Sequence, residues 1–121
     1  MAYIDGCVLA VPTANKDKYE AYAAKADALL IEFGATRVVE TWSDDIPDGK
    51  QTDFKRAVLA KDDEHIVFSF IEWPDKATRD AGWEKLMKDP RMDPASNSMP
   101  FDGSRLIYGG FQPTLDLKGK G

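Results

Sequence analysis

The sequence predicts an α+β domain in which one antiparallel sheet carries two helices on the same face. Strand-like and helix-like segments alternate along the 121 residues in the order β-α-β-(β)-β-α-β, the ferredoxin-like or split βαβ arrangement. Hydrophobic residues make up 43% of the chain, which is enough for one packed core. Because crossover connections are right-handed, both helices are expected on one side of a four-stranded sheet.

The first half of the chain predicts a strand, a helix and a second strand. Residues 3–12 (YIDGCVLAVP) form the first strand, which ends at Pro12 because proline cannot donate to a sheet ladder. In the helix that follows, Thr13 or Asn15 caps the start and Gly34 takes the left-handed closing position. Residues 35–43 (ATRVVETWS) alternate as the second strand. The apolar positions of the helix, spaced by three and four, are Tyr19, Tyr22, Ala23, Ala26, Leu29, Leu30 and Phe33.

The second half repeats this pattern after a turn-rich loop. Residues 54–60 (FKRAVLA) are predicted to add a short strand, and residues 66–73 (IVFSFIEW) have the strongest strand composition in the chain. A second helix starts at residues 74–75 and ends at residues 89–90, both of which contain proline. Residues 105–111 (RLIYGGF) form the last strand. Residues 1–117 are therefore expected to be one domain, followed by a disordered tail at 118–121.

Apolar side chains occur on both faces of the predicted strands. In residues 66–73, one face carries Ile66, Phe68 and Phe70, and the other carries Val67, Ile71 and Trp73. A strand with one face in water should instead alternate apolar and polar residues. Two helices can cover only one face of the sheet. We therefore expect a second copy of the chain to cover the other face, giving a homodimer of the dimeric α+β barrel type.

Composition excludes several classes of protein. Sixteen Lys and Arg against 21 Asp and Glu give a net charge of -5, which disfavours binding to nucleic acid or to an anionic membrane. No apolar run approaches the roughly 20 residues that span a bilayer. Cys7 is the only cysteine, so neither an intrachain disulfide nor a cysteine-based zinc site can form. With no signal peptide recognised at the start, a cytoplasmic location is expected.

Five blocks of the sequence resemble a bacterial family, the domain of unknown function 1428. They are residues 3–12 (YIDGCVLAVP), 45–50 (DIPDGK) with 52–54 (TDF), 67–71 (VFSFI), 89–92 (DPRM) and 99–111 (MPFDGSRLIYGGF). The resemblance covers nearly the whole chain in order. It implies a ferredoxin-like, dimeric α+β barrel protein and carries over no catalytic residue.

Charged residues inside the apolar strands are the first candidates for chemistry. An unpaired carboxylate at Asp5, Glu40 or Glu72 would be costly to bury. Such a residue is either exposed at a strand end or paired with an arginine (Arg37, Arg56 or Arg105), which is the favoured interpretation, or it acts as a general base in a pocket. Arg79 lies one turn before Trp83 on the second helix and is expected to border the same cavity or to reach water. Asp5, Glu72 and Arg79 are the catalytic candidates.

No metal or cofactor site is expected. His65, the only histidine, lies in a polar turn beside Glu64, where exposure to solvent is the ordinary outcome. Residues 44–55 resemble a calcium loop only superficially, because Ile46 and Lys55 stand where oxygen ligands belong. Cys7 lies within a strand and is expected to be a small buried hydrophobe.

A long segment without periodicity, residues 89–104, contains three prolines and two methionines. Compact domains rarely keep so long an irregular segment without a use, so it is expected to close a pocket or to wrap a partner subunit. Asp102 and Arg105 are expected to form a structural ion pair. The candidates for a pocket wall are Trp42, Trp83, Met99, Phe101 and Tyr108.

Two functions remain open from the sequence. In the first, the homodimer binds a small, partly apolar molecule between sheet and helices and acts on it as a cofactor-free oxygenase or isomerase. In the second, the dimer is structural or regulatory and has no pocket. An apolar cavity with a carboxylate or arginine in its wall favours the first, and a solid core favours the second.

Overall fold

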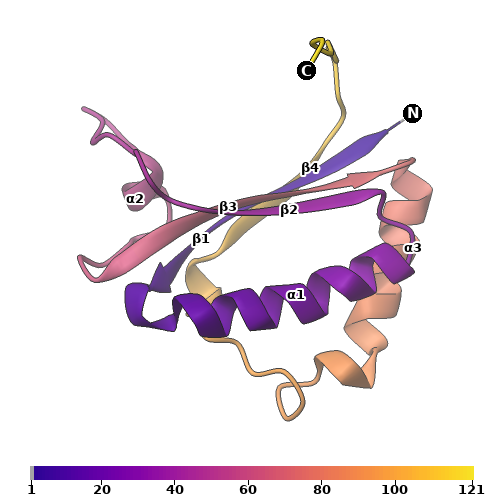
Figure 1. The fold of residues 1–121 in the computed structure, drawn as a ribbon, viewed down its shortest axis with the longest axis horizontal. Helices are drawn as coiled ribbons and strands as arrows, with labels where there is room; N and C mark the ends of the chain where they lie inside the picture. Colours follow the sequence, from indigo (N-terminus) through magenta and orange to yellow (C-terminus); the bar gives the residue numbers. More distant parts are fainter. Residues whose placement is uncertain (1) are drawn as a thin grey trace.

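The structure, a computed structural model, describes residues 2–121 as one antiparallel sheet with helices packed beside it (Figure 1). The four strands lie in the order β2-β3-β1-β4. This is the predicted ferredoxin-like arrangement, with one extra helical turn between β2 and β3. The elements are β1 (Tyr3–Pro12), α1 (Lys16–Glu32), β2 (Arg37–Trp42), α2 (Phe54–Ala57), β3 (Glu64–Trp73), α3 (Lys76–Lys88) and β4 (Ile107–Phe111), with 3-10 turns at Thr13–Asn15, Pro90–Met92 and Gly103–Arg105.

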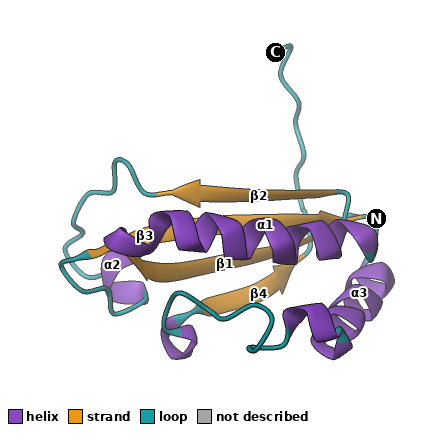
Figure 2. Cartoon of the chain, turned by 60° about the horizontal axis from the view of Figure 1, so that its bottom comes forward, coloured by secondary structure: helices purple, strands orange, loops and turns teal. Residues whose placement is uncertain are grey.

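The two faces of the sheet differ in what covers them. Helices α1 and α3 lie on one side (Figures 1 and 2), and there Leu9 and Val11 of β1 are buried with Val67 of β3. We call the opposite side the open face. One end of it is covered by Val58, directly after α2, which packs on Ala10 and Ile66. From the strand register, the open face comprises Ile4, Gly6, Val8 and Ala10 of β1, Arg37, Val39 and Thr41 of β2, Ile66, Phe68, Phe70 and Glu72 of β3, and Ile107, Gly109 and Phe111 of β4.

Helix α1 forms where the periodicity predicts it. Its core-facing residues include Tyr19, Ala23 and Leu30, all buried against the sheet. Gly34 follows the helix with φ +119°, a left-handed conformation that residues with a side chain rarely adopt, so the predicted closing role is confirmed. Asn15 stands at the start of the helix but makes no capping bond. Its amide donates instead to the carbonyl of Pro100, 2.9 Å away.

The strand predicted at residues 54–60 is wrong. Phe54–Ala57 is a short helix, because the carboxylate of Asp53 accepts from the backbone N–H of Arg56 at 2.8 Å and caps a helical turn. Leu59 then takes a φ of +51°, which ends any extended run. Val58 is the buried apolar residue of this segment, so its apolar residues do not follow the alternation of a strand.

Helix α3 is held close to the sheet. Asp75 caps its start by accepting from the backbone N–H of Thr78 at 2.7 Å, as the sequence suggests for residues 74–75. Gly82 permits the approach, since a Cβ there would lie 2.6 Å from the ring of Trp73. α3 therefore brings its side chains directly onto β1 and β3.

The segment 89–104 folds back over α1 of its own chain (Figure 1, orange). Lys25 of α1 donates to the carbonyl of Ser96 at 3.1 Å, and Phe101 packs edge-on against Tyr19 and Tyr22. The ion pair predicted for Arg105 with Asp102 is present at 3.1 Å. Arg105 also makes a closer, largely buried pair with Glu64 at 2.7 Å.

Beyond β4, residues 112–121 contain no helix or strand and extend away from the sheet (Figure 1). Within residues 2–121, every helix is too short or too polar to cross a membrane.

Candidate functional site

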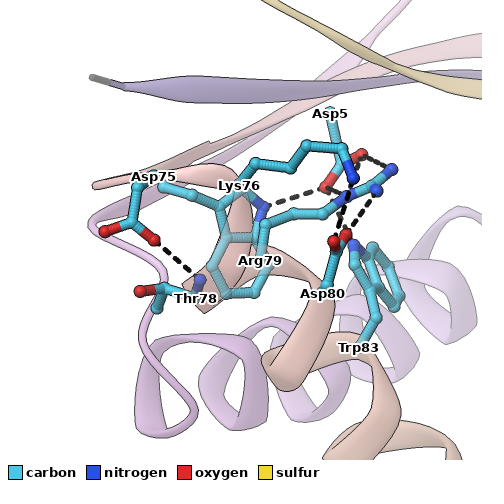
Figure 3. Close-up of polar contacts among 8 residues, drawn as sticks. Asp5, Asp75, Lys76, Thr78, Arg79, Asp80 and Trp83 are labelled. Atoms are coloured by element: carbon cyan, nitrogen blue, oxygen red, sulfur yellow. Dashed lines mark hydrogen bonds and ion pairs between the residues drawn. The ribbon is translucent and has the colours of Figure 1, made fainter.

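A carboxylate of β1, on the helix-covered side of the sheet, joins α3 to the sheet (Figure 3). Asp5 of β1 is only 7% exposed, and its oxygens accept hydrogen bonds from three side chains. The indole N–H groups of Trp73 and Trp83 donate at 2.9 and 2.8 Å, and the Arg79 guanidinium donates from Nη2 at 2.7 Å and from Nε at 3.1 Å. Asp80 accepts from the other side of the same guanidinium at 2.9 Å and so orients it.

This network brings two of the three catalytic candidates together in a paired state. Four N–H groups donate to the Asp5 carboxylate, which leaves it no free position for a substrate proton. The hydrogen bonds with Asp5 also raise the pKa of Arg79. Asp5 does pair with an arginine, but the expected partners Arg37, Arg56 and Arg105 are wrong. The partner is Arg79, because α3 packs beside β1 at Asp5. The arrangement therefore stabilises the docking of α3.

A polar row crosses the same side of the sheet next to Asp5. In register, Glu40 of β2 lies beside Ser69 of β3, which lies beside Cys7 of β1, which lies beside Tyr108 of β4. The two neighbouring rows are mainly apolar; they contain Val38 with Ile71, and Trp42 with Val67 and Leu9. We call Glu40, Ser69, Cys7 and Tyr108 the polar row. Four polar or titratable side chains thus point toward the helix layer, where apolar ones are the rule.

Helix α1 places two more titratable groups above the polar row. Tyr19, which is buried, donates its hydroxyl to Glu40 at 2.7 Å. Asp27, two turns further along α1, shares a hydrogen bond with Glu40. Burial and the nearby Glu40 carboxyl together raise the pKa of Asp27 from 3.8 to about 8. With this raised pKa, the Asp27 carboxyl is largely protonated at neutral pH.

The thiol and the phenols nearby are held in their neutral forms. Burial raises the pKa of Cys7 to about 11, partly offset by a hydrogen bond with Ser69 and reinforced by Glu40 and Asp27. Burial also raises the pKa of Tyr19 and of Tyr22. Cys7 is thus a thiol at physiological pH and not a nucleophilic thiolate. Among the groups with raised pKa values here, it is Asp27 whose pKa, about 8, lies near neutral pH.

The third catalytic candidate, Glu72, lies on the open face. It forms a long pair with Arg37 at 3.8 Å in which both side chains are exposed to solvent. This matches the predicted pairing, and it separates Glu72 from both Asp5 and the polar row. The structure therefore gathers Asp5 and Arg79 but not Glu72.

The five predicted pocket residues lie in different places. Trp83 binds Asp5, Phe101 packs over Tyr19, and Tyr108 ends the polar row with its side chain exposed. Trp42 stacks on His65 at 4.8 Å, and Met99 is exposed beside Gly103. Phe101 and Tyr108 therefore flank the polar row, while Trp83 adjoins it through Asp5.

Two hollows lie toward the open face. The first, of about 210 Å³, is lined by residues of β2 and β3 and by Ile46 and Phe54. The second, of about 230 Å³, lies over the paired glycines Gly6 and Gly109. Neither hollow coincides with the expected location between sheet and helices.

Across residues 2–121, no group of three or more His, Cys, Asp or Glu side chains is arranged to hold a metal ion. His65 is partly buried and bonds through Nδ1 to the hydroxyl of Thr13 at 2.7 Å, in addition to its stacking on Trp42. The expectation of a solvent-exposed turn is therefore wrong for His65, which is a packed side chain near the start of β3.

Sequence reasoning missed Tyr19, Asp27 and Ser69. Tyr19 fits the apolar period of α1, Asp27 reads as an ordinary surface acid, and Ser69 is a single polar residue in an apolar strand. The one signal that the sequence contained is polar residues on the strand face turned toward the helices: Ser69, which is buried, and Glu40, which is exposed on edge strand β2. It could be used only with the strand register, which places Cys7 and Glu40 on either side of Ser69.

Comparison with known proteins gives one family and several close relatives. The family model described as "Protein of unknown function (DUF1428)" matches residues 2–103. The chain is 56% identical over 116 residues to "Uncharacterized protein YbaA" of Escherichia coli strain K12, which covers 96% of this chain and 99% of that protein. The protein of the same name from Shigella flexneri matches to the same extent.

Proposed function

The chain belongs to the family of proteins of unknown function DUF1428, and from that premise we propose that it is a homodimer that binds a small, partly apolar molecule between its sheet and its helices and moves a proton on that molecule. The observation that carries the chemistry is the Asp27–Glu40 carboxyl pair above the polar row. A cytoplasmic location belongs to the same proposal and is supported by the single cysteine.

The carboxyl pair supports isomerase-type proton transfer. One carboxyl, Asp27, carries a proton near neutral pH, and the other, Glu40, accepts from Tyr19 and from Asp27. Glu40 takes a proton from a carbon next to a carbonyl of the ligand, and Asp27 gives its proton to another atom of the resulting enolate. The shared hydrogen bond then returns the proton from Glu40 to Asp27. The step needs no cofactor, and the same deprotonation opens a cofactor-free oxygenase reaction when dioxygen is the co-reactant.

The surroundings favour a ligand that is partly apolar. Tyr19, Tyr22 and Phe101 form an aromatic cluster with ring centroids 5.6 to 6.5 Å apart above one side of the polar row. Cys7 and Ser69 supply a neutral thiol and a hydroxyl beneath it. A flat molecule with one or two carbonyl oxygens suits this combination of aromatic walls and polar floor.

A structural or regulatory dimer is the second candidate function. Two observations favour it: the Asp5 network fills the space below α3, and both hollows lie toward the open face. In that case the carboxyl pair only fixes α1 on β2. The two candidates differ in whether a ligand binds at Glu40.

Native mass spectrometry of freshly purified protein, followed by thermal-shift screening with quinones and aromatic acids, tests the choice. We expect at least one compound to raise the melting temperature of the wild-type protein and to lose this effect in Glu40→Gln. Glu84→Gln is the control, because Glu84 is exposed on α3 and pairs only with Lys88 at 3.0 Å. If nothing co-purifies and no compound shifts the melting temperature, the structural dimer is the correct function.

A further inference from the structure

We propose that the side chain of Phe101 occupies the ring position of the proposed ligand, and that residues 93–101 swing away from helix α1 to admit that ligand. This rests on the proposed function and adds the regulation of the same site. We call residues 93–101 the lid. Three features carry the proposal: the place of Phe101, the way the lid is fastened to α1, and the firmer hold on the chain at both ends of the lid.

Phe101 lies where the aromatic cluster meets the polar row. Its ring packs edge-on against the rings of Tyr19 and Tyr22, with centroids 5.8 and 5.6 Å away. It also packs on the buried cluster that contains Tyr19, and Cys7 of the polar row packs on the same cluster. Tyr19 in turn donates to Glu40 at 2.7 Å. Phe101 and the ring of the ligand therefore compete for one place.

This competition accounts for the filled state of the space between sheet and helices. Both hollows lie toward the open face, and Phe101 lines neither of them. The Phe101 side chain ends in a benzene ring, and an apolar cavity of roughly 150 Å³ holds a benzene molecule. Withdrawal of Phe101 therefore makes room for one six-membered ring beside Tyr19. The class of ligand that fits is a single flat ring with a carbonyl group on it.

Two side chains of α1 fasten the lid. The Asn15 amide donates to the carbonyl of Pro100 at 2.9 Å, and the Lys25 ammonium donates to the carbonyl of Ser96 at 3.1 Å. Asn15 stands where a side chain ordinarily caps a helix, but it makes no capping bond. Its hydrogen-bonding capacity is used on the lid instead. Loss of these two bonds frees the lid without uncapping α1.

The chain on either side of the lid is held more firmly than the lid itself. Arg91, just before the lid, pairs with Glu32 of α1 at 2.8 Å. Arg105, just after it, pairs with Glu64 at 2.7 Å, and both of these side chains are largely buried. Charged pairs of this kind are stronger than bonds to a neutral carbonyl. A segment with fixed ends and a lightly held middle moves as a unit about its ends.

Cys7 makes opening of the lid measurable, because it is the only cysteine in the chain and packs on the same cluster as Phe101. The rate at which dithiodipyridine modifies Cys7 should rise about tenfold in the double variant Asn15→Ala with Lys25→Met, since two lost hydrogen bonds raise the open population. Lys25→Met alone should give a smaller rise. Lys18→Met removes an exposed lysine from the same helix and should keep the wild-type rate. Circular dichroism confirms that each variant is folded.

Binding of acetophenone, a benzene ring with one carbonyl group, tests the place of Phe101. When only the open form binds, the apparent dissociation constant is inversely proportional to the open population. The double variant should therefore bind acetophenone more tightly by the same factor as its Cys7 reacts faster, and Lys18→Met should bind it as the wild type does. Ligand-observed NMR gives the dissociation constants. Bound acetophenone should also slow the modification of Cys7 in the double variant.

The other outcomes separate the lid from the proposed function. Equal Cys7 rates in the wild type and the double variant overturn the lid, and the proposed function then stands or falls by its own thermal-shift screen. Faster modification of Cys7 with an unchanged acetophenone affinity overturns the place assigned to Phe101. Faster modification with no acetophenone bound to any variant, together with a thermal-shift screen that finds no compound, overturns the proposed function and the lid's regulation of it.

Discussion

Two carboxylates in the strands illustrate how the environment of a single residue decides its role. Asp5 is enclosed by two indoles and a guanidinium, whereas Glu72 faces solvent beside Arg37 at 3.8 Å. Breaking a buried ion pair leaves the partner charge without compensation, but an exposed pair is screened by water. The two acids look alike in the sequence, but replacing Asp5 should lower the free energy of unfolding far more than replacing Glu72.

Asp5→Asn is expected to lower the free energy of unfolding by roughly 3 kcal/mol, because Arg79 loses its buried counter-charge. Glu72→Gln is the matched control, with an expected loss below about 0.5 kcal/mol. Urea denaturation of both variants at one pH measures the difference. Equal losses in the two variants would show that the Asp5 network does not stabilise α3.

The pKa of Asp27 links stability to pH. The folded protein holds the Asp27 proton up to a pKa of about 8, while the unfolded chain releases it near the usual 3.8. Between these values the folded state binds more protons than the unfolded state. The contribution of Asp27 to stability is therefore fully present below pH 3.8 and is lost as the pH rises through about 8.

Asp27→Asn should flatten this pH dependence, since an amide cannot ionise. Relative to the wild type, the variant should gain stability as the pH rises from 4 to 8, by at most about 1.4 kcal/mol per pH unit for a single proton. Asp17→Asn, at an exposed position on the same helix, is the control and should follow the wild type. Parallel wild-type and Asp27→Asn curves from urea denaturation across this range would contradict the raised pKa.

At the scale of elements, the approach of α3 to the sheet depends on one glycine. A Cβ at Gly82 would lie 2.6 and 2.7 Å from atoms of the Trp73 ring and 3.2 Å from the carbonyl oxygen of Phe33. Arg79 and Trp83 of α3 both donate to Asp5, so the helix cannot move away without disturbing that network. The glycine sets the distance at which Arg79 and Trp83 reach Asp5.

Gly82→Ala should therefore destabilise the protein by roughly 1 to 3 kcal/mol through overpacking. In an unhindered helix the same change is expected to stabilise by about 1 kcal/mol. Ala81→Gly, the reverse change at the adjacent exposed position, should cost about 1 kcal/mol from helix propensity alone. Thermal or urea denaturation gives both values, and a stabilised Gly82→Ala would refute the tight contact.

Element prediction succeeded where one local signal dominated. The periodicity of α1 and the left-handed Gly34 agree with the structure, because the helix and its closing residue depend on nearby residues. Residues 54–60 failed because Asp53 caps a helical turn, and a short apolar run does not distinguish a strand from a buried turn. The path of residues 89–104 over α1 could not be predicted, since it depends on contacts far apart in sequence, such as Asn15 with Pro100.

At the scale of the whole molecule, the sheet has apolar residues on both faces. Helices α1 and α3 cover only one of them and leave most of the open face uncovered. If a second copy covers the open face, unfolding also separates the two chains, so stability depends on protein concentration. The wild-type melting temperature should rise with protein concentration in differential scanning calorimetry. Ile107→Asp places a charge among the exposed apolar side chains of the open face, and its melting temperature should stay constant. A constant wild-type value would argue against the homodimer.

The sequence by itself determined the order of elements, the ferredoxin-like sheet and the two apolar faces, because these follow from periodicity and from short-range turn and capping residues. It also indicated Asp5 and Glu40 as unusual. Only the tertiary structure decided which groups surround these acids. Asp5 accepts hydrogen bonds from Arg79, Trp73 and Trp83. Glu40 accepts one from Tyr19 and lies beside Asp27. The reason is physical: strand register and helix docking bring these side chains together, and both depend on the packing of the whole chain.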